Sequence, residues 1–298
     1  MSKDLKSKLA VGLLRILGKL PLWLLRLLAF KVFILLMLVP NKTVAQTQLN
    51  IRRCWPTLSQ RAQKKLVRQS VLQTVNAALE MGLNWTCKSD NNLKSVVHVK
   101  GQECLEQAVN RGGVVLITPH LGNWELFANW AAHQCKVTAL YTPAKLPGLD
   151  QLIYNARSKA GMALAPASAK GVMQLKRALV KSEVVLILPD QEPKPPSGIK
   201  SFWFGQPAYT MTLAAQLTKT KNTQVVLGFA KRLPLNQGFA IELEDITQLV
   251  EKASHQDTTD DVVVLENKVQ AINDAIEVMV RSAPQQYQWE YNRFKHIS

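Results

Sequence analysis

The chain has 298 residues, of which 47% are hydrophobic and 19% are charged, and its formal net charge is +16. This composition excludes a disordered or fibrous protein, and the length suits one catalytic domain with a small appendage. The positive charge indicates a polyanionic partner, namely nucleic acid, an anionic membrane surface, an acidic protein or a phosphorylated substrate. The four cysteines show no Cys-x-x-Cys spacing, so we expect reduced thiols and neither a zinc site nor a disulfide framework.

An almost wholly apolar stretch runs from Leu20 to Val39. It lacks a small-residue cleavage site, which argues against a cleaved signal peptide. Its length suits one membrane crossing, but Arg26 and Lys31 interrupt it. These two cations cost about +2.5 to +3.5 kcal/mol each on an insertion scale, which nearly cancels the gain from the apolar side chains. The sequence therefore leaves open whether this helix spans a membrane or lies on it.

The cations near this stretch favour attachment to a membrane surface. At about 100° per residue, Arg15, Lys19 and Arg26 share one helical face, as in a helix whose cations meet lipid headgroups. A hydrophobic helix packed on the protein's own core is the alternative. We expect residues 1–45 to form a membrane anchor that supplies no catalytic residue, and residues 46–298 to form the catalytic domain.

The rest of the chain alternates helical patterns with short β-branched runs. Helices are predicted over residues 59–85, 123–133, 149–160, 170–181, 209–219 and 262–282, with a polar loop at 251–261. Strands are predicted at 114–118, 136–141, 184–188, 224–232 and 239–244. This alternation predicts an α/β fold with a mixed, largely parallel sheet flanked by helices, preceded by the N-terminal hydrophobic membrane-anchoring helix.

The segment VVLITPHLGNWELF places His120 just beyond a buried strand, where reactive groups collect in such sheets. Pro119 ends the strand, Gly122 permits a tight turn, and Asn123 can cap the helix that follows. Across this turn, Glu125 can accept a hydrogen bond from one imidazole nitrogen of His120 while the other takes a proton. A surface His beside an unrelated Glu at a helix start is the alternative.

Groups for covalent catalysis are scarce in this sequence. It has no Gly-x-Ser-x-Gly elbow, glycine-rich phosphate loop or dinucleotide fingerprint, and Cys135 lies on a predicted helix as a packing residue. We therefore predict a direct reaction. His120 removes a proton from an acceptor hydroxyl, and this hydroxyl attacks an activated acyl group.

The segment HLGNWE resembles the His-x4-Asp/Glu motif of the glycerolipid acyltransferase superfamily, in the form typical of the late (secondary) acyltransferases of lipid A biosynthesis, the lauroyl- and myristoyltransferase family. The resemblance extends through RGGVVLITPHLGNWEL, YTPAKLPGLDQLIYNARSKAGM, VVLILPDQEPKPPSGIKSFWFGQPAYTMTLAAQLT and APQQYQWEYNRFK. It implies transfer of a fatty acyl chain from acyl carrier protein to a hydroxyl of a phosphorylated lipid A precursor. It also implies a location at the bacterial inner membrane, with the catalytic domain on the cytoplasmic side, and no metal or organic cofactor.

The same resemblance assigns roles to individual residues. His120 is the base and Glu125 its partner, while Arg157 binds substrate phosphate or stabilises developing charge. A solvated helix cation is the alternative for Arg157, and a turn-forming residue the alternative for Asp190. Further candidate substrate-binding residues lie at strand ends and helix starts: Asn123, Lys170, Asp190 and Gln191.

The chain departs from the family pattern near its C-terminus and after one strand. Many relatives have a second basic residue where Asn292 stands, and the spacing after Asp190 differs. Arg293 and Lys295 match the basic tail of the family, although a basic surface end explains them nearly as well. These departures leave the acyl chain length and the acylated position undetermined.

A lysophosphatidate or other lysophospholipid acyltransferase is the alternative enzyme. Such enzymes usually have Asp at the second motif position and a later Pro-Glu-Gly-Thr-Arg-like run, whereas this chain has Glu125 and a DQEPKP segment. A nucleic-acid partner is not expected, because the cations are dispersed and no recognition helix or basic run with interleaved aromatics is present.

Overall fold

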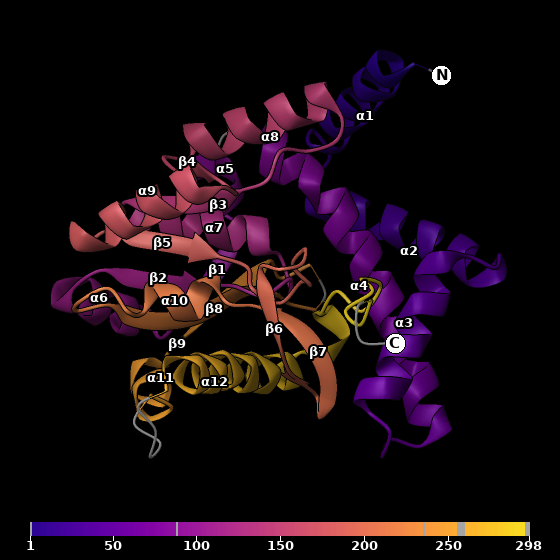
Figure 1. Cartoon of the computed structure of the whole chain (residues 1–298). Coiled ribbons are helices and arrows are strands. Elements are labelled where there is room, and N and C mark those ends of the chain that lie inside the picture. Colours follow the sequence, from indigo (N-terminus) through magenta and orange to yellow (C-terminus); the bar gives the residue numbers. More distant parts are fainter. Residues whose placement is uncertain (1, 88, 235, 255–259, 296–298) are drawn as a thin grey trace.

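The computed structural model describes residues 2–87, 89–234, 236–254 and 260–295 (Figure 1). Helices come first along the chain, and α4 is the predicted long helix. Ser59 caps α4, because its hydroxyl accepts a hydrogen bond from the main-chain N–H of Ala62 at 3.3 Å. The N-terminal helices are α1 (Lys3–Leu17), α2 (Leu22–Leu38), α3 (Lys42–Cys54), α4 (Gln60–Thr86) and α5 (Ser89–Leu93).

A 7-stranded sheet with the order β1-β9-β8-β2-β5-β3-β4 forms the centre of the molecule. Neighbouring strands are parallel except β8 and β9, which are antiparallel. This confirms the predicted mixed, largely parallel sheet. Its strands are β1 (Val96–Lys100), β2 (Val114–Ile117), β3 (Val137–Tyr141), β4 (Ala163–Pro166), β5 (Val184–Ile187), β8 (Gln224–Arg232) and β9 (Phe239–Asp245).

Helices cover both faces of this sheet, which explains why its central strands are apolar throughout. In β2, Val115 and Ile117 face a core formed with α9, α10 and α12, whereas Val114 and Leu116 face a core formed with α6 and α7. In Figure 1, α12 lies below the sheet and the arrow of β5 points towards α4. These helices are α6 (Gln102–Arg111), α7 (Trp124–Gln134), α8 (Pro147–Lys159), α9 (Ala169–Val180), α10 (Leu213–Leu217), α11 (Thr247–Lys252) and α12 (Asp261–Ser282).

The structure corrects two predicted elements. Most of the predicted helix 209–219 does not form, because its first residues belong to β7 (Gln206–Met211), which pairs with β6 (Gly198–Trp203) in an antiparallel hairpin. Hairpin pairing overrides the helical pattern there, and only the short α10 follows. The predicted loop 251–261 begins inside α11, and residues 255–259 of that loop lie outside the described residues.

The N-terminal helices pack on α4 (Figure 1). Two glycines allow α1 and α4 to approach closely, since a Cβ atom added at Gly18 would lie 2.6 Å from the carbonyl oxygen of Gly82. The α1 hydroxyl of Ser7 also accepts a hydrogen bond from the main-chain N–H of Gly148, at the start of α8, at 2.7 Å. These contacts hold α1 against both α4 and α8.

The three N-terminal cations do not share the one helical face that the sequence predicts for them. The helix is interrupted between α1 and α2, next to Pro21, so Arg15, Lys19 and Arg26 do not lie on one continuous helix. Arg26 is half-buried, and its Nη1 donates to the carbonyl oxygen of Leu233 at 3.1 Å.

Among the described residues, no single helix is long and apolar enough to cross a membrane. Helices α2 and α3 would together be long and apolar enough, but they are bent by 82° relative to each other.

Candidate active site

His120 and Asp190 meet at the carboxyl ends of two neighbouring parallel strands. In the pairing of β2 with β5, Ile117 lies opposite Ile187, and each is followed three residues later by one of these two side chains. Because parallel strands end at the same edge of a sheet, the shared register brings the two together. Nδ1 of His120 lies 2.9 Å from Oδ1 of Asp190, and the main-chain N–H of His120 donates to Oδ2, also at 2.9 Å.

This contact determines which imidazole nitrogen is available for chemistry. An ionised carboxylate only accepts hydrogen bonds, so Nδ1 of His120 carries a proton and Nε2 carries the lone pair. No hydrogen bond to Nε2 is found in the described part of the chain. The sequence predicts Glu125 as the partner of the imidazole, whereas the structure places Asp190 there, because β5 adjoins β2 in the sheet.

The Asp190 carboxylate is almost fully buried, with 1% of its side chain exposed, against 16% for His120. Burial alone would raise the pKa of Asp190. The charge of His120 in its protonated form and the hydrogen bonds from His120 outweigh burial and lower that pKa. Asp190 therefore stays ionised and stabilises an imidazolium at His120.

Glu125 pairs with Arg157. Glu125 lies in the first turn of α7, and Arg157 lies near the end of α8. Nε of Arg157 donates to Oε2 of Glu125 at 3.2 Å, and its Nη2 donates to Oε1, so the pair is bidentate. Burial would raise the pKa of Glu125, but Arg157 lowers it, with a smaller contribution from His120. Arg157 is thus not a solvated helix cation, and its charge is already balanced within the protein.

The turn after His120 requires its particular residues. Gly122 has a φ of +62°, and a Cβ atom there would lie 2.1 Å from the carbonyl oxygen of Ala230. That same oxygen accepts a hydrogen bond from the main-chain N–H of Asn123 at 2.8 Å. As predicted, Asn123 caps α7, because its Oδ1 accepts from the main-chain N–H of Leu126 at 3.0 Å. The turn therefore carries His120 and Glu125 at a fixed distance from β8.

Comparisons with known proteins identify the family of this chain. A sequence model of the family described as bacterial lipid A biosynthesis acyltransferase matches residues 4–296. The chain belongs to this family. It is 25% identical over 248 residues to "Lipid A biosynthesis lauroyltransferase" of Escherichia coli (strain K12), which covers 83% of this chain and 77% of that protein. It is also 22% identical over 253 residues to "Lipid A biosynthesis acyltransferase" of Haemophilus influenzae (strain ATCC 51907 / DSM 11121 / KW20 / Rd), with 84% and 74% covered. The family membership confirms the resemblance based on HLGNWE.

In this lipid A acyltransferase, the side chain of Asn123 is buried and hydrogen-bonded within the protein. Its Nδ2 donates to Glu80 at 3.1 Å, and its Oδ1 accepts from Asn84 at 2.8 Å, so both amide atoms are used within the buried interior. Arg232 in turn binds Glu80 through Nε at 2.8 Å. The sequence reasoning missed this pair. The sequence does hold one sign of this pair, because Glu80 is the only acidic residue of the predicted helix 59–85.

The C-terminal segment covers the His120 turn. The main-chain N–H of Gln288 donates to the carbonyl oxygen of His120 at 3.0 Å, and Nε2 of Gln191 donates to the side chain of Gln288 at 2.9 Å. Gln191 therefore lies beside the His120 turn, and its role in substrate binding stays a prediction. Arg293 is buried and donates through Nη1 to the carbonyl oxygen of Tyr209 at 2.6 Å, whereas Lys295 is exposed. Only Lys295 fits a basic surface end.

Lys170 lies apart from His120 and Asp190. It is exposed in the first turn of α9, after the edge strand β4, which is separated from β2 by β5 and β3. At about 4.8 Å per strand this places β4 on the order of 14 Å from β2. The structure therefore brings together His120, Glu125, Arg157, Asp190 and Gln191, but not Lys170. The expectation that the reaction needs no metal or organic cofactor stays a prediction.

Proposed function

We propose that this family member moves a fatty acyl chain from acyl carrier protein to a hydroxyl of a phosphorylated lipid A precursor, with His120 as the general base. The observation that carries the proposal is the orientation of His120, whose Nδ1 binds buried Asp190 and whose Nε2 is left to accept a proton. A base held this way by a carboxylate is suited to activating a hydroxyl.

The proposed step balances without a covalent enzyme intermediate. The acceptor hydroxyl gives its proton to Nε2 of His120 while its oxygen attacks the thioester carbonyl carbon. The carbon–sulfur bond then breaks, and the imidazolium returns the proton to the leaving thiolate. Asp190 stabilises the imidazolium throughout. Cys135 is a poor nucleophile, because it lies at the far end of α7 and burial raises its pKa to about 11.

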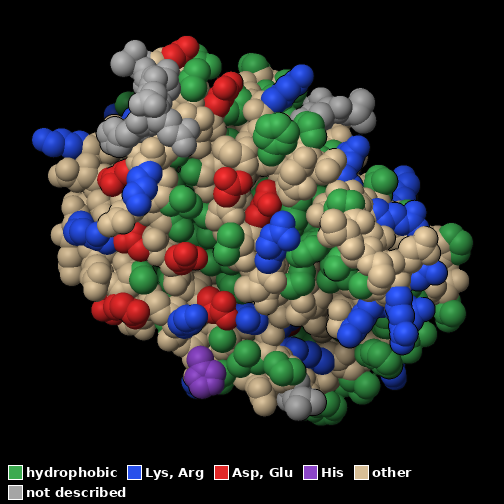
Figure 2. Space-filling view, turned by 90° about the horizontal axis from the view of Figure 1, so that it is seen from below, with side chains coloured by type: hydrophobic (Ala, Val, Ile, Leu, Met, Phe, Trp, Pro, Cys, Tyr) green, Lys and Arg blue, Asp and Glu red, His purple; other side chains and the backbone are tan. Residues whose placement is uncertain are grey.

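A surface rich in cations supports an acidic protein partner such as acyl carrier protein. No Asp or Glu occurs between Leu5 and Leu79. Figure 2 shows Lys and Arg gathered on its right side, where α3 and the beginning of α4 lie, and acidic side chains more on its left. Such a surface steers an acidic partner towards the site. The exposed cations of this region are Arg52, Arg53, Arg61, Lys64, Lys65 and Arg68.

We also propose that the protein attaches to the bacterial inner membrane with its catalytic domain on the cytoplasmic side. An exposed apolar surface on α1 and α2 supports the attachment to a membrane. Large apolar side chains rarely gather on a protein surface without a partner, and an interfacial helix buries such a face among lipid chains. On α1 the exposed side chains recur every three or four residues. The set comprises Leu5, Leu9, Leu13, Ile16, Trp23, Leu27, Phe30, Leu35 and Leu38.

The test is acyl transfer by the purified protein in detergent, with acyl carrier protein thioester as donor and a phosphorylated lipid A precursor as acceptor. Mass spectrometry should show the precursor heavier by one acyl group. His120→Ala should lower turnover by about 10²–10⁴-fold with folding intact. His98→Ala, which removes an exposed histidine of β1, is the matched control and should remain active. Preferred acylation of lysophosphatidate would replace the proposal with the alternative enzyme, and acyl-protein trapped from donor alone would contradict direct attack.

A further inference from the structure

A groove runs between α1 and α8 and ends beside the active site. Its inner part has a volume of about 750 Å³ and its outer part about 760 Å³, and the two share Arg15, Leu152 and Asn155. Each volume is typical of a site for a small organic group. The two parts follow one another along α1 and α8, where they have these lining residues in common.

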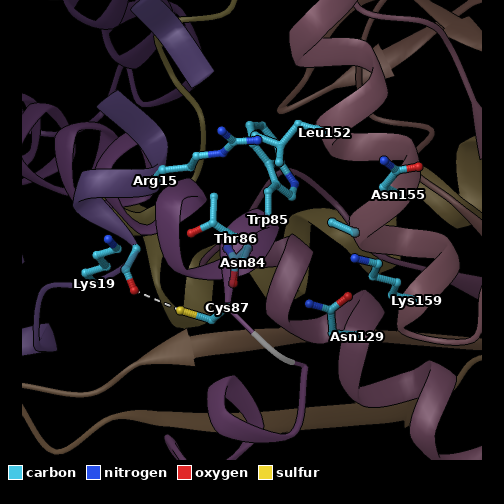
Figure 3. A pocket seen from close by; sticks show the side chains of 12 residues that line it. Arg15, Lys19, Asn84, Trp85, Thr86, Cys87, Asn129, Leu152, Asn155 and Lys159 are labelled. Atoms are coloured by element: carbon cyan, nitrogen blue, oxygen red, sulfur yellow. Dashed lines mark hydrogen bonds between the residues drawn. The ribbon is translucent and has the colours of Figure 1, made fainter. Parts of the chain in front are cut away.

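The inner part is strongly cationic. Figure 3 shows Arg15 of α1 and Lys159 of α8 reaching into it from opposite sides, with Lys19 at its edge. None of these three cations forms an ion pair with a described residue. The other lining residues that the structure describes are uncharged, and they include amide side chains such as Asn129 and Asn155. Three unpaired cations among neutral hydrogen-bonding groups form a site that fits a multiply charged anion.

The inner end reaches residues close to Glu125 and Arg157 in the chain. Asn129 lies one turn after Glu125 on α7, and Ala156 precedes Arg157 on α8. Trp85 also lines the groove, and it is one of the residues that lower the pKa of Glu125. A molecule in the groove would therefore extend up to the Glu125–Arg157 pair, which lies beside the proposed base.

The outer wall indicates that the anion belongs to a lipid. The face of α1 opposite the groove exposes Leu5, Leu9 and Leu13, the surface proposed to enter the membrane. A helix in that position lies at the level of the headgroups, so its flanking cations meet lipid phosphates. Arg157, the sequence-predicted phosphate ligand, is already paired with Glu125. The unpaired cations of the groove are therefore better placed than Arg157 to bind a phosphate.

We infer that the groove between α1 and α8 binds a phosphate group of the acceptor lipid through Arg15, Lys19 and Lys159. This rests on the proposed function, in which the acceptor is a phosphorylated lipid A precursor. The three cations hold the phosphate while the rest of the acceptor extends towards His120. The phosphate is not changed in the reaction, so these contacts are equally strong in the ground state and the transition state. They therefore affect KM and not kcat.

The test compares the triple variant Arg15→Ala/Lys19→Ala/Lys159→Ala with Lys176→Ala/Arg177→Ala/Lys181→Ala. The second set removes the same charges from exposed positions on and just after α9. Equilibrium binding without donor is measured in neutral detergent micelles. The lipid probes are a phosphorylated lipid A precursor, its phosphatase-treated form and phosphatidylglycerol.

The groove variant should bind the phosphorylated precursor at least tenfold more weakly than the control variant, and its KM should rise equally with kcat within about twofold. Affinity for the phosphatase-treated lipid should match the control, and charge-preserving Arg15→Lys/Lys19→Arg/Lys159→Arg should restore most of the binding. Equal affinities in the two triple variants would overturn the inference. An equal loss for phosphatidylglycerol would show a general anionic-lipid surface instead. The binding measurement needs no acyl donor. If the protein bound the lipid through the groove but transferred no acyl chain, the proposed function would be refuted and the inference about the groove would stand.

Discussion

Asp190 holds His120 twice, through the imidazole Nδ1 and through the main-chain N–H, with both distances 2.9 Å. One carboxylate therefore fixes the ring and the backbone of the same residue. The arrangement depends on the register of β2 with β5, in which Ile117 and Ile187 lie side by side. Because Nδ1 faces Asp190, Nε2 is the imidazole nitrogen without a hydrogen-bond partner among the described residues.

Asp190→Asn should lower kcat by about 10²-fold or more, because a neutral amide no longer favours a proton on Nδ1 or stabilises the imidazolium. Glu125→Gln, which leaves the contact between Asp190 and His120 intact, should cost less activity. Steady-state acyl transfer by both variants, with circular dichroism to verify folding, gives the comparison. If Asp190→Asn kept turnover within about threefold of wild type while Glu125→Gln lost it, Glu125 would be the functional partner of His120.

Arg157→Ala should reduce the free energy of unfolding by about 3–5 kcal/mol, because it leaves the buried Glu125 carboxylate without its partner. Arg157→Lys should recover only part of this loss, since an ammonium cannot reproduce the two-pronged contact. Denaturant titration in detergent measures both, and Glu125→Ala/Arg157→Ala should lose less than the sum of the two single variants. Wild-type stability and kinetics in Arg157→Ala would refute the importance of this pair.

Gly122→Ala should destabilise the protein by about 1–3 kcal/mol and lower activity, because the new methyl group collides with Ala230 and shifts the turn that carries His120. Gly205→Ala is the control, with a φ of +70° and open space around its Cβ position. It should cost only about 1 kcal/mol and leave activity unchanged. Thermal unfolding and acyl transfer are measured on both. Equal effects of the two substitutions would mean that the close approach to Ala230 is unimportant.

The free energy of unfolding should fall at acid pH, because the carboxylates of Asp190 and Glu125 become protonated. Folding lowers the pKa of Asp190 and of Glu125 below their ordinary values of 3.8 and 4.5. Groups of this kind stabilise the fold fully above those values, and the contribution is lost as the pH falls through the lower folded pKa. The unfolding free energy of the wild type should therefore drop more steeply below about pH 4.5 than that of Asp190→Asn/Glu125→Gln. Denaturant titrations across this range decide it, and identical slopes would contradict the prediction.

Trp23→Ser/Phe30→Ser should weaken binding to anionic lipid vesicles by about tenfold or more, because burial of a large apolar side chain is worth about 1.5–3 kcal/mol. The two side chains are 57% and 50% exposed on α2. Val180→Ser/Phe202→Ser, at positions 74% and 56% exposed on α9 and β6, is the matched control. Co-sedimentation with phosphatidylglycerol vesicles measures the difference. If both pairs lost binding equally, α2 would not be the membrane-facing element.

Local features of the active-site turn followed from the sequence alone. The apolar run VVLI predicts a strand buried on both faces, and Pro119, Gly122 and Asn123 predict its end, the turn and the helix cap, all of which the structure contains. Such features depend on backbone geometry and on side chains a few residues apart, so they are encoded locally. The motif HLGNWE likewise predicted the family from adjacent residues.

The partners of these residues were decided by the tertiary structure. Asp190 reaches His120 only because β5 adjoins β2, although the matching runs VVLITPH and VVLILPD did place a reactive residue at equal distance from each strand. Burial then pairs Glu125 with Arg157, because an acid taken out of water needs an opposite charge at close range. Strand order and burial arise from contacts between segments far apart in the chain, and no local pattern contains them.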